Sequence, residues 1–396
     1  MQGGHGRLPR RGHRPRRRLA APLPPVGRFY RRVIRPALFA IPSEPVHDLT
    51  LAGLGLAAEH ADLCALTRRI FGAPELPTEV FGLRFPNPLG LAAGMDKHAA
   101  AVPVWEALGF GFSELGGVTR HAQPGNPAPR MFRAPAEGAL VNRMGFNNPG
   151  ADAFAERLRA WHAAGRWPVH PVGVNLGKSK ATPLAEAADD YAYSFRRCWP
   201  WADFFVVNVS SPNTPNLRRL QDRAALDAIL RALQEANAAL AAAAGRGPKP
   251  LLVKVAPDLS FDALDEILAL AAPRGLAGLI ATNTTVTRPE TADAKAQATF
   301  AEAGGLSGRP LRRRANEVIR HLHRQTRGRL PIIGVGGVFD AADAWEKLAC
   351  GASLVQAYTG LVYEGPALAR VIMCGLRERL ARSGARSLAE IVGSAA

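Results

Sequence analysis

Acidic residues are absent from the first 36 positions of this chain, which contain eleven arginines. This segment supplies eleven of the seventeen net positive charges, so the other 360 residues are only mildly basic. A basic arm can contact nucleic acid or anionic lipid, and it also occurs as a solvated tail without a partner. Aromatic residues are scarce in the arm, and its charge excess stops before the rest of the chain, which disfavours nucleic-acid binding. We expect residues 1–25, rich in Arg, Pro and Gly, to be a disordered basic tail.

Cysteine is rare and widely spaced, without a C-x-x-C pair or a histidine nearby at metal-ligand spacing. This pattern argues against a disulfide framework and against a zinc site. We therefore expect no metal and four reduced thiols in the core, at Cys64, Cys198, Cys350 and Cys374.

Long apolar runs are also missing near the N-terminus, where the longest uncharged run, Leu49–Ala58, is too short to span a bilayer. Apolar residues nevertheless recur there at helical spacing, with arginines on the other faces. We expect one helix from Val26 that Pro36 kinks or interrupts, and a second helical stretch, Glu44–Phe71, capped by Ser43. Residues 26–75 would then form a helical domain that either lies in a membrane interface or caps the rest of the chain.

From residue 78 onward, short apolar runs alternate with helical stretches. The expected strands are 88–92, 112–116, 172–176, 204–209, 251–255, 279–283, 331–335 and 354–358, and helices are expected at 224–243, 262–272, 312–326 and 341–349. Eight β/α alternations predict a closed parallel (β/α)8 TIM barrel over residues 78–385, with its site at the carboxyl ends of the strands. Two long connections, 119–171 and 284–330, predict a lid or a binding wall. No G-x-G-x-x-G follows the first strand, which disfavours a doubly wound dinucleotide fold.

Four of these apolar runs end in polar residues, namely Asn175, Asn208, Lys254 and Thr282–Thr284. A polar group inside a buried strand is costly without a partner, so the four ends indicate one shared ligand. Lys254 would act as a Schiff-base nucleophile or as a fixed charge, and its asparagine neighbours favour the fixed charge. Asp96 and Asp258 are the only carboxylates expected near these strand ends, which argues against a carboxylate-dyad or metal-dependent hydrolase.

Two other groups of residues indicate the kind of ligand. The turns Gly334–Gly337 and Tyr358–Gly360 follow the last two strands, where barrels commonly bind a phosphate of a substrate or of flavin mononucleotide (FMN). The loop Asn142–Asn148, with several further asparagines and Lys97, suits a planar substrate that carries ring amides and a carboxylate.

These residues resemble the quinone-dependent, membrane-associated (class 2) dihydroorotate dehydrogenases of pyrimidine biosynthesis, over about residues 28–380. The motifs that carry the resemblance are Asn87–Lys97, Pro124–Pro127, Asn142–Asn148, Asn208–Thr214, Lys254–Leu259 and Gly304–Pro310. The resemblance implies a flavoprotein that oxidises (S)-dihydroorotate to orotate, with FMN as hydride acceptor and ubiquinone or menaquinone as electron acceptor. It also implies that the N-terminal helices dock on the membrane and admit the quinone.

The resemblance assigns roles to individual residues. Ser211 would be the base that takes the proton from carbon 5, aided by a relay through water and Thr214, while hydride leaves carbon 6. Soluble relatives place a cysteine at this position, so the serine favours the quinone-dependent branch. Implied flavin contacts are Ala93, Gly94, Met95, Asp96, Lys97, Gly117, Asn175, Asn208, Lys254 and Thr282, with the phosphate at Gly308, Gly337, Tyr358 and Thr359. Implied substrate contacts are Lys97, Asn142, Arg143, Met144, Gly145, Phe146, Asn208, Asn213, Asn283 and Thr284.

Lys254 would stabilise the reduced flavin ring. Family members often carry Thr or Ser where this chain has Gly117, so one side-chain contact to flavin would be missing. A soluble flavin reductase or oxidase, or a phosphate-binding lyase or isomerase without flavin, remains as an alternative on the same barrel. The Ala- and Arg-rich composition suggests a GC-rich bacterium, and we expect peripheral attachment to the cytoplasmic side of the inner membrane.

Overall fold

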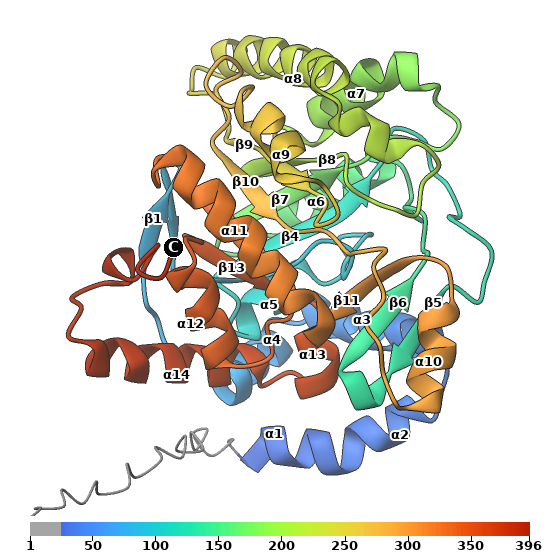
Figure 1. The fold of residues 1–396 in the computed structure, drawn as a ribbon, viewed down its shortest axis with the longest axis vertical. Helices are drawn as coiled ribbons and strands as arrows, with labels where there is room; N and C mark the ends of the chain where they lie inside the picture. The colour runs from blue at the N-terminus through green and yellow to red at the C-terminus, as the bar shows by residue number, and fades with distance from the viewer. Residues whose placement is uncertain (1–24) are drawn as a thin grey trace, which may run out of the picture.

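Eight parallel strands form a closed barrel in the computed structural model, which describes residues 25–396 (Figure 1). Residues 1–24, nearly all of the predicted basic tail, lie outside the described residues. Around the barrel the strands follow chain order: β3 (Leu89–Leu91), β4 (Phe112–Val118), β7 (Val172–Leu176), β8 (Phe204–Asn208), β9 (Leu251–Val255), β10 (Gly278–Ala281), β12 (Ile332–Val335) and β13 (Leu354–Ala357). Each coincides with a predicted strand to within two residues, so the TIM barrel is confirmed.

The amino ends of the strands are closed by aromatic side chains. A hairpin of β1 (Thr78–Val80) and β2 (Leu83–Phe85) places Phe85 against Phe112, with ring centroids 5.3 Å apart. Phe112 in turn packs on Phe204, and all three rings are fully buried. Because this end of the barrel is filled with apolar side chains, a ligand site has to lie at the carboxyl ends.

Helices cover the outside of the barrel, as the apolar pattern on both faces of the strands requires. They are α5 (Val102–Ala107), α6 (Ala151–Ala163), α7 (Ala187–Cys198), α8 (Arg223–Ala243), α9 (Phe261–Leu268), α11 (Arg312–Thr326), α12 (Ala341–Ala349), α13 (Thr359–Glu364) and α14 (Leu368–Ser383). Of the four predicted helices, only α9 ends early, because residues 269–275 form turns in place of its last helical turn.

The two long connections build a wall beside the mouth of the barrel. Strands β5 (Met131–Ala134) and β6 (Ala139–Asn142) come from the first connection, and β11 (Gly305–Gly308) comes from the second. They pair as one antiparallel sheet in the order β11-β6-β5, and helix α10 (Ala294–Ala301) packs against β5. The predicted binding wall is therefore present.

The N-terminal helices differ from the prediction in two places. The first segment continues through α1 (Pro25–Phe29), a π-helical turn (Tyr30–Ile34) and α2 (Arg35–Phe39). The π-helical turn, which is wider than an α-helical turn, comes just before Pro36. Proline has no backbone N–H to donate, and its ring crowds the turn that precedes it. The second stretch is two helices, α3 (Ser43–Glu59) and α4 (Ala61–Phe71), and the chain bends by 114° between them.

Ser43 was predicted to be the N-cap of the second helical stretch, and this prediction is wrong. Ser43 is the first residue of α3, and its Oγ accepts a hydrogen bond of 2.9 Å from Arg133 Nε on the wall instead of one from its own helix.

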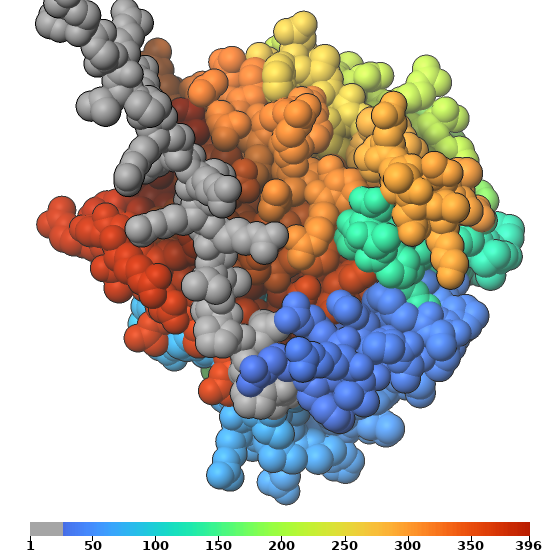
Figure 2. Space-filling model, turned by 60° about the horizontal axis from the view of Figure 1, so that its bottom comes forward, coloured from blue at the N-terminus to red at the C-terminus, as the bar shows by residue number. Residues whose placement is uncertain are grey.

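Exposed apolar side chains concentrate on these helices, which form one continuous surface in Figure 2. Among the described residues, eight of the twelve large exposed hydrophobic side chains belong to them: Phe29, Val33, Ile34, Leu49, Leu56, Leu63, Leu66 and Ile70. A ninth, Ile41, lies in the short link between α2 and α3. No described helix is long and apolar enough to cross a membrane by itself; α3 and α4 together meet the length and composition criteria but are sharply bent.

The cysteine prediction is partly wrong. All four thiols are free, and Cys198 and Cys350 are buried, but Cys64 is half-buried and Cys374 is exposed on α14. Among residues 25–396, no three His, Cys, Asp or Glu side chains are grouped so as to hold a metal ion.

Candidate active site

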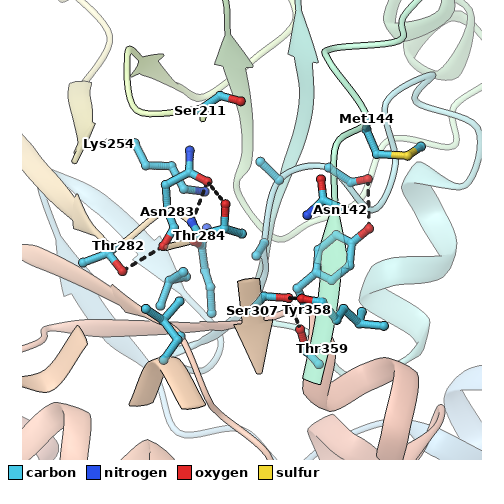
Figure 3. Close-up of a pocket in the computed structure, with 18 of the residues that line it drawn as sticks. Asn142, Met144, Ser211, Lys254, Thr282, Asn283, Thr284, Ser307, Tyr358 and Thr359 are labelled. Atoms are coloured by element: carbon cyan, nitrogen blue, oxygen red, sulfur yellow. Dashed lines mark hydrogen bonds between the residues drawn. The ribbon is translucent and has the colours of Figure 1, made fainter. Parts of the chain in front are cut away.

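A cavity of about 1090 Å³, its open mouth included, lies between the carboxyl ends of the strands and the wall. Lys254, Thr282 and Asn283 lie on one side of it, and Asn142, Met144 and Tyr358 lie on the other (Figure 3). Twenty of the 24 predicted site residues line it: Ala93, Gly94, Lys97, Gly117, Asn142, Met144, Gly145, Phe146, Asn175, Asn208, Ser211, Asn213, Lys254, Thr282, Asn283, Thr284, Gly308, Gly337, Tyr358 and Thr359. Met95, Asp96, Arg143 and Thr214 are not among the lining residues.

The asparagines at the strand ends form one hydrogen-bonded chain. Asn208 Nδ2 donates to Asn175 Oδ1 at 2.9 Å, and Asn283 Nδ2 donates to Asn208 Oδ1 at 3.2 Å. Across the cavity, Asn213 Nδ2 donates to Asn142 Oδ1 at 3.1 Å. The other polar atom of this side chain, the buried Asn213 Oδ1, has no partner in the described chain. The shared ligand predicted from the strand ends is consistent with this unused acceptor, because buried polar atoms normally have partners.

A carboxylate that the sequence analysis missed lies beneath this network. Glu114, on β4, is fully buried, and its Oε2 lies 3.5 Å from Lys254 Nζ. It accepts hydrogen bonds from Asn175 Nδ2 at 2.5 Å and from Gln356 Nε2 at 2.8 Å. The expectation that only Asp96 and Asp258 lie near the strand ends is therefore wrong, because Glu114 lies buried beside Lys254.

Lys97 is the second lysine that lines the cavity, and it lies in the loop after β3. Its Nζ donates to Asn147 Oδ1 at 2.7 Å. Burial, and then the Arg130 guanidinium nearby, lower the pKa of Lys97 to about 8. The ammonium is therefore mainly charged at neutral pH and close to titration, which suits an anion-binding group.

Its neighbour Asp96 has a structural role. The carboxylate accepts hydrogen bonds from the backbone N–H of Ala100 and Ala101 and from Trp105 Nε1. These bonds hold the loop that presents Lys97, so Asp96 shapes the site without reaching the cavity.

The guanidinium of Arg143 is directed to other partners, contrary to its expected substrate contact. It donates to Glu302 Oε2 at 2.6 Å and to Pro129 O at 2.9 Å, and it lies over the ring of Phe132. Thr214 also lies behind the lining, but its buried Oγ1 has no hydrogen-bond partner in the described chain.

Gly117 is matched to the position of Phe146. A Cβ added to Gly117 would lie 2.6 Å from Phe146 Cε1 and 3.0 Å from Asn175 Oδ1. A Ser or Thr side chain therefore has no room here unless the ring moves. Glycine therefore fits this position as the structure has it.

The predicted phosphate end combines backbone groups with hydroxyls. Gly337 has φ +73°, and a Cβ there would lie 2.5 Å from Arg312 Cβ, so this turn requires glycine. Thr359 begins α13, where backbone N–H groups have no partner within the helix, and its Oγ1 shares a hydrogen bond of 2.9 Å with Ser307 Oγ. Unpaired N–H groups and hydroxyls together suit a phosphate.

Comparisons with known proteins identify the family of this chain. Residues 75–380 match the family model described as dihydroorotate dehydrogenase. A relative from Gloeobacter violaceus named dihydroorotate dehydrogenase (quinone) is 54% identical over 366 residues, 92% of this chain and 98% of the relative. One of the same name from Salinispora arenicola is 54% identical over 353 residues, 88% of this chain and 99% of the relative.

Among solved structures, a DHODH from Eimeria tenella in complex with ferulenol superimposes with a TM-score of 0.79 at 36% identity. The match covers 89% of this chain and 95% of the Eimeria chain. The closed barrel, the match to the family model and the relatives that align over nearly their full length lead to one conclusion. The chain belongs to the dihydroorotate dehydrogenase family.

Proposed function

We propose that this chain oxidises dihydroorotate to orotate in pyrimidine biosynthesis, using FMN and delivering the electrons to a membrane quinone. The observation that carries the proposal is a single cavity lined by an amide network, by Lys254 with Glu114 buried beneath it, and by Ser211. The relatives named as quinone-dependent enzymes, more than half identical over most of the chain, support the substrate and the acceptor.

The residues present fit a flavin. Gln356 Oε1 is a buried acceptor without a partner in the described chain, and a ring N–H would satisfy it. Lys254, Asn175 and Thr282 would hold the ring, and the phosphate would lie at the turns of Gly308, Gly337 and Thr359. When bound, the flavin accepts hydride from the substrate and passes the electrons to the quinone.

The substrate would lie against Asn142, Asn213 and Asn283, with its carboxylate near Lys97. Ser211 Oγ lines the cavity at the tip of the loop after β8, where it accepts a hydrogen bond of 3.3 Å from the backbone N–H of Asn213. In our proposal it takes the proton from carbon 5, and Thr214, whose hydroxyl has no other described partner, relays that proton through water.

An anaerobic absorbance titration tests this function. The purified protein should show a flavin band that bleaches with dihydroorotate and returns when a soluble quinone is added. Release and chromatography of the cofactor should identify FMN. A colourless protein would contradict the proposal and favour a phosphate-binding lyase, and a yellow protein that dihydroorotate leaves unchanged would contradict the substrate.

Orotate affinity should weaken above about pH 8. The bound carboxylate favours the protonated form of Lys97, whose pKa in the ligand-free protein is about 8. Affinity is therefore full at a pH well below 8 and falls as the pH rises through 8, by roughly tenfold per pH unit until the pKa of the complex is reached. Orotate titrations between pH 7 and 10 measure this. Lys97→Arg, which stays charged, should flatten the profile, and a flat wild-type profile would contradict the role of Lys97.

We also propose that the protein attaches peripherally to the cytoplasmic face of a bacterial inner membrane, where it would use ubiquinone or menaquinone. Helices α3 and α4 expose leucines toward solvent, for example Leu49 and Leu56, which are 65% and 64% exposed. An apolar face of this kind lies in the boundary between headgroups and acyl chains. The same helices would admit the quinone to the barrel.

Leu56→Asp should reduce co-sedimentation with lipid vesicles and raise the KM for a long-chain quinone. The charge has to leave water if this face enters the membrane, at a cost of several kcal/mol. Phe261→Asp is a matched control, because Phe261 is also exposed but lies on α9 on the barrel (Figure 1). Equal vesicle binding by wild type and Leu56→Asp would rule out this face as the attachment surface.

A further inference from the structure

The segment Gln123–Asn126 crosses over both loops that present substrate-binding groups. Asn126 Nδ2 donates to Arg143 O at 2.9 Å and to Asn213 O at 3.0 Å, so one amide joins the loop after β6 to the loop after β8. The Asn126 backbone N–H also donates to Met144 O at 3.0 Å. The amide packs so closely on Gly145 that a Cβ there would lie 2.8 Å from Asn126 Cγ.

Asn126 is itself held by an ion pair with the N-terminal helices. Arg130 Nη1 donates to Asn126 O at 2.8 Å and to Pro124 O at 2.6 Å. The rest of the guanidinium pairs with Glu44 of α3, through Nε and Nη2 at 2.8 and 2.7 Å. Both side chains are largely shielded from solvent, so the pair is more than a mobile surface contact.

Helix α3 also acts on Lys97 directly. The carboxylates of Glu44 and Asp48 favour the charged form of Lys97 and partly offset the effect of burial on its pKa. Burial, and then Lys97, lower the pKa of His47 to about 4, so α3 presents a neutral imidazole to this side of the site. Helix α3 therefore lies close to Lys97, although none of its residues lines the cavity.

We infer that Asn126 is a positioning residue for dihydroorotate oxidation, and that the Glu44–Arg130 ion pair lets helix α3 hold it in place. The N-terminal helices then set the geometry of the flavin-reducing half-reaction, in addition to their proposed part in binding membrane and quinone. This inference rests on the proposed roles of Ser211 and Asn213, because Asn126 acts only through the loop that carries them.

Stopped-flow measurement of the two half-reactions tests the inference. Asn126→Ala should weaken dihydroorotate binding and slow flavin reduction by roughly 10- to 100-fold, since a displacement of about 1 Å has an effect of that size. Reoxidation by a short-chain soluble quinone should keep the wild-type rate, which a general loss of structure would not allow. Gln234→Ala removes a comparable amide-to-carbonyl bond on α8 and should change neither half-reaction.

Glu44→Gln tests the link to α3 with little change in shape. It should slow flavin reduction in the same direction as Asn126→Ala but less, by roughly 3- to 10-fold, because Arg130 keeps its bonds to Pro124 and Asn126. Glu44→Asp, which retains the charge, should recover part of the rate. The control Glu156→Gln breaks the bidentate Glu156–Arg159 pair on α6 and should have no effect.

The outcomes separate this inference from the proposed function. If Ser211→Ala reduces flavin at the wild-type rate, the proposed base is wrong. If Ser211→Ala is slow while Asn126→Ala and Glu44→Gln both reduce flavin at the wild-type rate, the inference is overturned and the function stands. If Glu44→Gln alters only quinone reoxidation, the N-terminal helices do not position the substrate loops, and the inference is again overturned.

Discussion

Replacing Ser211 by alanine is expected to lower the rate of flavin reduction by dihydroorotate by roughly 10²- to 10⁴-fold, the usual contribution of a positioned general base. Ser211 Oγ lines the cavity, whereas the hydroxyl of the adjacent Ser210 is engaged with Asn208 and Asn283. No described carboxylate lines the cavity to replace it. Anaerobic stopped-flow with excess dihydroorotate measures the rate, and the flavin content of the variant should match that of wild type.

Ser211→Cys is the informative companion variant. A thiol has an ordinary pKa of about 8.5, so the variant should retain more activity than Ser211→Ala and should gain a pH dependence near that value. Thr214→Ala should show a smaller loss than Ser211→Ala, because Thr214 would act only through water. If Ser211→Ala turns over normally with full flavin content, another group takes the proton and the assignment fails.

The barrel and most of the site are predictable because their signals are local. Each strand is an apolar run with a recognisable end, and Lys254 and Asn175 stand out as polar residues inside such runs. The same signal marks Glu114, in Phe112–Gly116, and Gln356, in the last strand. Only polar residues at the very ends of the strands were predicted to bind a ligand. Glu114 and Gln356 lie earlier in their strands, where side chains point into the barrel one layer below the ends.

Contacts between distant segments were not predictable. Arg143 lies inside a substrate-binding motif, but its side chain turns to Glu302, which is 159 residues away in the chain. Serine is a common N-cap residue, yet the hydroxyl of Ser43 accepts a hydrogen bond from Arg133 on the wall and caps no helix. The break between α3 and α4 at His60 has no proline or glycine to signal it. Sequence spacing fixes which groups are available, and tertiary structure decides which of them face the ligand.

Glu114→Leu is expected to produce the largest loss of stability of the substitutions considered, about 3–5 kcal/mol in the free energy of unfolding. Lys254 would keep a buried ammonium without its counter-charge, and the side chains of Asn175 and Gln356 would each lose an acceptor. Thermal or urea unfolding with bound flavin measures the loss. Glu266→Gln is the control, because it breaks an ion pair with Arg223 on the exposed surface and should change stability little.

A double-mutant cycle separates the ion pair from simple packing. Lys254→Met alone leaves Glu114 as an unpaired buried charge and should also destabilise strongly. The double variant Glu114→Leu with Lys254→Met buries neither charge, so its loss should be smaller than the sum of the two single losses. Flavin binding should nevertheless stay weak in the double variant, because Lys254 would no longer face the ring. Additive losses would show that the two charges do not compensate each other. Normal flavin affinity without Lys254 would remove it from the proposed cofactor site.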